Sequence, residues 1–157
     1  MMGSGDWIVL IIIGLLCVVG AVYDARTKTV PVWLLVVGSG SVFAAGILPF
    51  LCGEKAWYPA CGVTLPQRII GLLPGAVLLA LSLRKQLLGI ADAVLILLVG
   101  WGIGFRLLCF FLTMSFLCLF PAALFCMAVL HRRRTDTLPF YPFAALGWLA
   151  LTVCLLV

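Results

Sequence analysis

The chain has 157 residues, of which 66% are hydrophobic and 10% are charged, and its formal net charge is +5. Soluble domains carry roughly 25% charged residues, and a chain of this length cannot bury so much apolar surface in a water-soluble core. The composition therefore excludes an ordinary soluble domain and predicts an integral membrane protein. The basic residues lie in short stretches between apolar segments, which favours control of membrane topology over binding to nucleic acid.

Apolar segments recur along the chain at lengths suited to membrane-spanning helices. A span needs about 17–25 apolar residues, and fewer where flanking side chains reach the interface. We predict six: Trp7–Tyr23, Pro31–Leu51, Pro66–Leu83, Ala91–Ile103, Phe105–Leu130 and Phe140–Val157. The fourth is short, and Gly100, Gly102 and Gly104 are expected to bend or end it. No linker or internal repeat divides residues 1–157, which predicts one all-α domain, a bundle of about six transmembrane helices.

Positive charge alternates from one predicted loop to the next. The first, third and fifth loops hold seven of the Lys and Arg residues, and the second and fourth hold three. Because loops rich in Lys and Arg stay in the cytoplasm, the odd loops are predicted to be cytoplasmic and both termini to lie outside. Asp24 ends the first span and Asp92 begins the fourth, so this topology places both carboxylates on the cytoplasmic side of the cell membrane.

The chain has few acidic residues, which are Asp6, Asp24, Glu54, Asp92 and Asp136. Asp24 and Asp92 lie at the ends of apolar segments, where a charge is costly. Two carboxylates that share a site cannot both ionise easily, so one keeps a proton and the other can activate a water for attack on a peptide carbonyl. The alternative is structural: Asp24 meets water at a helix end and Asp92 is an N-cap.

The other reactive side chains give weaker evidence of a catalytic or metal site. The only histidine, His131, stands beside three arginines and is interpreted as a solvated loop residue. The seven cysteines form neither a CxxC pair nor a metal-binding spacing, so neither a metal nor another cofactor is expected. Cys52 and Cys61 flank one loop, where a disulfide would need an oxidising compartment.

Three segments resemble blocks of the prepilin peptidase family, the membrane aspartic proteases that process type IV pilins. Tyr23–Pro31 is similar to the block in which an Asp ends a helix and is followed by basic residues and Val-Pro. Gly89–Asp92 is similar to the G-x-G-D motif, with Ala91 in place of the second glycine. Leu138–Gly147 resembles the proline-containing start of the last helix, and the three blocks occur in the family's order.

The resemblance implies that Asp24 and Asp92 are the catalytic pair of an aspartic endopeptidase. Four further motif positions would support them: Pro31, Gly89, Ala91 and Pro139. The implied reaction removes the basic leader from a type IV pilin-like precursor, which also has a hydrophobic helix, at the cytoplasmic membrane face. Longer members carry an extra cytoplasmic segment with CxxC motifs and methylate the new N-terminus. This chain lacks that segment, so methyl transfer is not expected.

Two other functions stay open. A catalytically degenerate relative would bind pilin-like helices or assist pilus or secretion assembly, and Ala91 favours it because alanine resists backbone shapes that glycine permits. A small transporter or channel would use the carboxylates as proton or cation carriers, but the scarcity of other polar residues within the predicted spans counts against it. The expected partners are pilin-like precursors and membrane lipid. The sequence does not identify the precursor or the oligomeric state.

Overall fold

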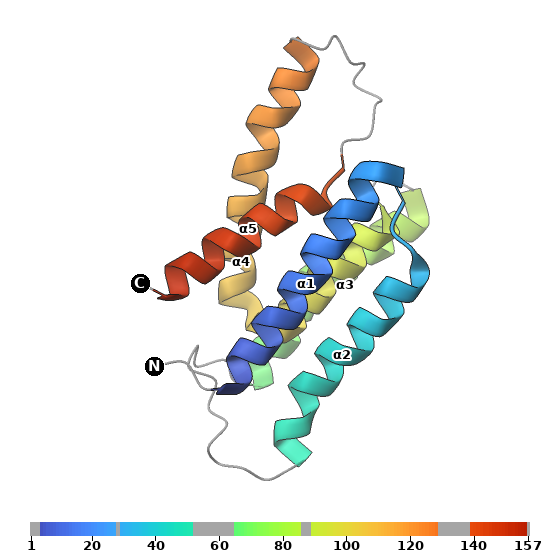
Figure 1. The fold of residues 1–157 in the computed structure, drawn as a ribbon. Helices are drawn as coiled ribbons and strands as arrows, with labels where there is room; N and C mark the ends of the chain where they lie inside the picture. Colours follow the sequence, from blue (N-terminus) through green and yellow to red (C-terminus); the bar gives the residue numbers. More distant parts are fainter. Residues whose placement is uncertain (1–3, 28, 52–64, 86–88, 129–138, 157) are drawn as a thin grey trace.

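The computed structural model describes residues 4–27, 29–51, 65–85, 89–128 and 139–156. These residues form the helices α1 (Ser4–Thr27), α2 (Val32–Leu51), α3 (Leu65–Lys85), α4 (Ile90–Ala128) and α5 (Tyr141–Leu156), as Figure 1 shows. The predicted all-α class is confirmed for this part of the chain. The first three predicted spans and the last one each correspond to one helix.

The fourth and fifth predicted spans belong to a single element, α4, which is broken at Gly104. This residue has φ 75° and ψ 171°, a combination that is essentially restricted to glycine. We call residues 90–103 the first half of α4 and residues 105–128 its second half. In Figure 1 the two halves run in different directions, so the yellow-green start and the orange end of α4 both lie in the upper part of the view. The described residues thus form five helical elements, of which α4 comprises two helices joined at this kink. The six membrane crossings stay a prediction.

Three helical segments of the described residues are long and apolar enough to cross a membrane: Trp7–Thr27, Pro66–Arg84 and Ile90–Phe125. The last has 36 residues, well above the roughly 20 that one crossing needs, and it contains the Gly104 break. Val32–Ile47 and Tyr141–Leu156 are shorter apolar helices. The fold is therefore compatible with a membrane protein.

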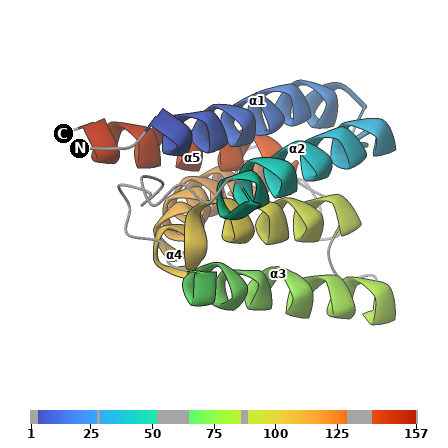
Figure 2. The same ribbon diagram turned by 90° about the horizontal axis from the view of Figure 1, so that it is seen from below.

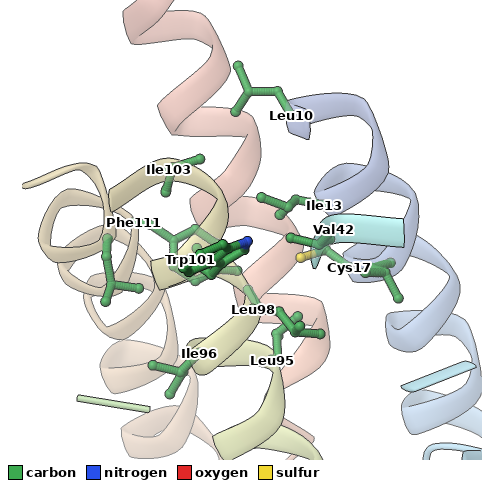
Figure 3. Close-up of a cluster of buried hydrophobic side chains, with 14 of the residues drawn as sticks. Leu10, Ile13, Cys17, Val42, Leu95, Ile96, Leu98, Trp101, Ile103 and Phe111 are labelled. Carbon is green, nitrogen blue, oxygen red and sulfur yellow. The ribbon is translucent and has the colours of Figure 1, made fainter. Parts of the chain in front are cut away.

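The first half of α4 is the central helix of the bundle. Figure 2 shows it between α3 on one side and α1 and α2 on the other, and it contacts all three. Leu98 and Val99 are completely or almost completely buried. Trp101 stacks on Phe43 of α2 with 5.1 Å between the ring centroids, and Figure 3 shows its ring in the apolar core beside Val42. This packing fixes the helix that carries Asp92.

The helices α3 and α4 pack with their backbones in contact. A Cβ atom on Gly71 would meet the carbonyl oxygen of Gly100, and one on Gly75 would meet the backbone of Leu97. Small residues permit this close approach, which supports helix association where lipid is as apolar as the helices themselves. The glycines of α3 therefore hold the central helix on the side away from α1.

Candidate functional site

Asp24 lies in the last turn of α1 and is half-buried. Its Oδ2 atom accepts a hydrogen bond of 3.2 Å from the backbone N–H of Tyr141, the first residue of α5. The first N–H groups of a helix lack partners within the helix, and the N-terminus favours negative charge. The Asp24 carboxylate thus caps the start of a helix that is distant in sequence.

Asp92 lies in the first turn of α4 and is half-buried as well. The carbonyl of Gly89 accepts the backbone N–H groups of Asp92 at 3.1 Å and Ala93 at 3.2 Å, which starts the helix. A Cβ atom on Gly89 would lie only 3.0 Å from Oδ2 of Asp92. Glycine at position 89 therefore leaves room for the carboxylate. The Asp24 carboxylate is close enough to Asp92 for their charges to interact.

Tyr141 connects α1 and α4, the two helices that carry Asp24 and Asp92. Its side chain is 1% exposed, and its hydroxyl donates a hydrogen bond of 3.2 Å to the carbonyl of Ala91, the neighbour of Asp92. Its ring lies over Gly20 of α1, where a Cβ atom would collide with it. A single residue therefore contacts Asp24 through its backbone and the start of α4 through its side chain.

Sequence reasoning assigned no role to Tyr141, although the residue lies within the third block that resembles the family. A tyrosine at the start of an apolar segment does indicate a hydrogen bond to another part of the chain, because a buried Tyr hydroxyl usually has a partner. Its partners could not be identified from the sequence, since they come from two other helices.

The remaining motif positions lie close to helix starts. Ala91 has regular helical backbone, because Gly104 is the one non-helical residue inside α4; alanine is therefore not strained there. The carbonyl of Pro31 accepts the backbone N–H of Leu34 at 3.0 Å and begins α2. Pro139 is half-buried and lies two residues before Tyr141, ahead of α5.

Several sequence predictions fall outside the residues or side chains that the structure describes. These concern Asp6, Cys52, Glu54, Cys61, His131 and Asp136. Within the described part of the chain, no group of three or more His, Cys, Asp or Glu side chains is arranged to hold a metal ion.

Asp24 and Asp92 together form a pair of half-buried acids where the end of α1 meets the starts of α4 and α5. Each is associated with a helix N-terminus, which tolerates its charge. Such a pair can hold one proton between two carboxyl groups and leave the other group to act as a base. It can also serve only to cap two helices.

Comparison of the chain with protein-family models, with curated proteins and with solved structures found no match in any of the three. What the site does must therefore be inferred from its own geometry and chemistry.

Proposed function

We propose that this protein is an intramembrane aspartic endopeptidase of the prepilin peptidase type, with Asp24 and Asp92 as its catalytic pair. The observation that carries the proposal is the meeting of these two acids at one end of an apolar bundle, with Tyr141 in contact with both helices. Acids in apolar segments are costly, and they are retained chiefly where they function.

In the proposed reaction, the ionised carboxylate of the pair takes a proton from a water molecule, and the water oxygen attacks the peptide carbonyl carbon. The protonated carboxyl group donates its proton to the carbonyl oxygen as the tetrahedral intermediate forms. Collapse of the intermediate breaks the C–N bond: the leaving amine takes a proton from the protonated carboxyl group, while one hydroxyl of the intermediate gives its proton to the other carboxylate and becomes the carbonyl of the product. The products are a carboxylic acid and an amine, and the pair regains its single proton without a metal or other cofactor.

The proposed substrate is a pilin-like precursor with a basic leader followed by a hydrophobic helix. A bundle of about six crossings would place the acid pair at the cytoplasmic face, because the loops richest in Lys and Arg adjoin the end of α1 and the starts of α4 and α5. The Gly104 break supports six crossings, since each half of α4 would then form one span. In this arrangement the precursor helix would lie in the membrane with its leader junction at the acids.

The test is cleavage of a co-expressed pilin-like precursor by the wild-type chain and by Asp24→Asn and Asp92→Asn. Each substitution removes a carboxylate but keeps the side-chain shape, and each should lower cleavage by about 10²–10⁴-fold. Glu54→Gln and Asp136→Asn make the same kind of change at other acids and should leave cleavage unaltered. Normal processing by either Asn variant at position 24 or 92 would reject the assignment.

A further inference from the structure

We propose that Tyr141 is the positioning residue of the acid pair: its buried phenol holds the start of α4 against α5 and thereby sets the separation of Asp92 from Asp24. This inference rests on the proposed peptidase function. It adds a residue whose role is to orient the two carboxylates and not to contact the substrate.

Tyr141 makes two hydrogen bonds that reach both acid-bearing helices. The backbone N–H binds Oδ2 of Asp24 at 3.2 Å, and the hydroxyl binds the carbonyl of Ala91 at 3.2 Å. Asp92 follows Ala91 directly in the first turn of α4, so a bond that fixes Ala91 also fixes the point from which the Asp92 side chain leaves the backbone. One residue thus sets the positions of both acids.

Burial and close packing hold the Tyr141 phenol in one position. The Tyr141 side chain is 1% exposed, and its ring fills the space that the absence of a Cβ atom leaves at Gly20. A buried ring in close packing has few alternative rotamers, and its hydroxyl would be costly to leave without a partner. The ring therefore holds its hydroxyl at one place, and the Ala91 carbonyl is the acceptor there.

Trp148 makes a similar contact two turns further along α5. The indole N–H of Trp148 donates to the carbonyl of Leu10 in α1 at 3.0 Å, and the ring lies over Gly14, where a Cβ atom would collide with it. Both aromatic residues thus pack over a glycine of α1 and donate to a backbone carbonyl of another helix. Of these two aromatic residues, it is Tyr141 that bonds to Asp24 and to the neighbour of Asp92, so Trp148 is the control.

The kinetic test compares Tyr141→Phe with Trp148→Phe, since each keeps an aromatic ring and loses one donor. A small displacement of a catalytic group can lower the rate by as much as about 10²-fold. We expect Tyr141→Phe to lower kcat by about tenfold or more with KM within about twofold, and Trp148→Phe to keep kcat near wild type. Wild-type kcat in Tyr141→Phe, or an equal loss in Trp148→Phe, would overturn the proposal.

A second measurement does not depend on cleavage. A hydrophobic carbodiimide reacts with protonated carboxyl groups, and mass spectrometry of the purified protein can follow labelling of Asp24 and Asp92 across a pH range. Among the described residues, the titratable groups whose charges act on Tyr141 are these two acids and Cys17 of α1. Because coupled acids titrate as a pair, a changed separation should move the labelling midpoint by about half a pH unit or more in Tyr141→Phe and not in Trp148→Phe.

These two measurements separate the positioning role from the peptidase function. If the wild-type chain cleaves no precursor but Tyr141→Phe alone changes the labelling profile, the proposed function fails and the positioning role stands. If Tyr141→Phe labels like the wild type, the positioning role is rejected whether or not the protein cleaves a precursor.

Discussion

The two ends of the first half of α4 are held in different ways. At its start, the carbonyl of Gly89 accepts two backbone N–H groups and the carbonyl of Ala91 accepts the Tyr141 hydroxyl, so directed hydrogen bonds define the arrangement. At its far end, Gly100 lies against Gly71 and Trp101 stacks on α2, so shape is the main constraint. The difference implies that substitutions at the start should alter chemistry more than folding, whereas substitutions at the packed end should alter folding first.

The largest effect on folding is expected from Gly75→Leu. A side chain there would collide with the backbone of Leu97, which cannot move without displacing the central helix. Overpacking usually costs about 1–3 kcal/mol and can cost more, so we expect little folded, monodisperse protein in detergent by size-exclusion chromatography.

Gly40 in α2 provides the matched control for that substitution. Apart from its chain neighbours and its own helix backbone, no described residue comes within 4 Å of the position that a Cβ atom would occupy there, so Gly40→Leu should fold like the wild type. Equal yields of folded protein from the two variants would show that the contact between α3 and α4 does not constrain the bundle.

A smaller loss of stability is expected from Gly104→Ala. With φ 75° and ψ 171°, this residue has a backbone conformation that costs other residues about 1–3 kcal/mol. Thermal unfolding in detergent should show the loss, while Gly40→Ala should raise stability by about 0.5–1 kcal/mol because alanine favours a helix. An unchanged unfolding midpoint in Gly104→Ala would mean that α4 is not bent at this residue in the folded protein.

The parts of the molecule that sequence could predict are those encoded by neighbouring residues. The concentration of glycines around Gly104 indicated where a break would fall, and runs of apolar residues indicated most helices. The predicted boundary between the fourth and fifth spans coincides with Gly104, the single non-helical residue between the two halves of α4. That each half crosses the membrane stays a prediction.

The contacts between helices could not be predicted, and the reason is physical. In these helices apolar residues occur on both the exposed and the buried sides, so hydrophobic periodicity does not identify the buried face. The pairing of Gly71 with Gly100 and of Gly20 with Tyr141 depends on how the helices are rotated against each other. The hydrogen bond between Tyr141 and Asp24 joins residues 117 positions apart, a separation that no local pattern encodes.

A comparison of Asp24→Ala with Asp24→Asn should separate helix capping from catalysis. Asn keeps an oxygen that can accept the N–H of Tyr141, whereas Ala leaves that N–H without its partner and should lower stability by about 1 kcal/mol relative to Asn. Chemical denaturation in detergent measures the difference, and cleavage should be lost in both variants. Equal stability of Asp24→Ala and Asp24→Asn would show that the hydrogen bond to α5 does not stabilise the protein. Retained cleavage by Asp24→Asn would show that Asp24 caps α5 and is not catalytic.

The smallest effect is expected from Ala91→Gly, the substitution that restores the G-x-G-D motif. The backbone at Ala91 is helical and its carbonyl accepts the Tyr141 hydroxyl; glycine can keep both features but should cost about 0.5–1 kcal/mol as a helical residue. Cleavage should therefore stay within about twofold of the wild type, measured with the same precursor. Cleavage that appears only after Ala91→Gly would favour the catalytically degenerate relative, because the native alanine would then be what disables an otherwise assembled acid pair.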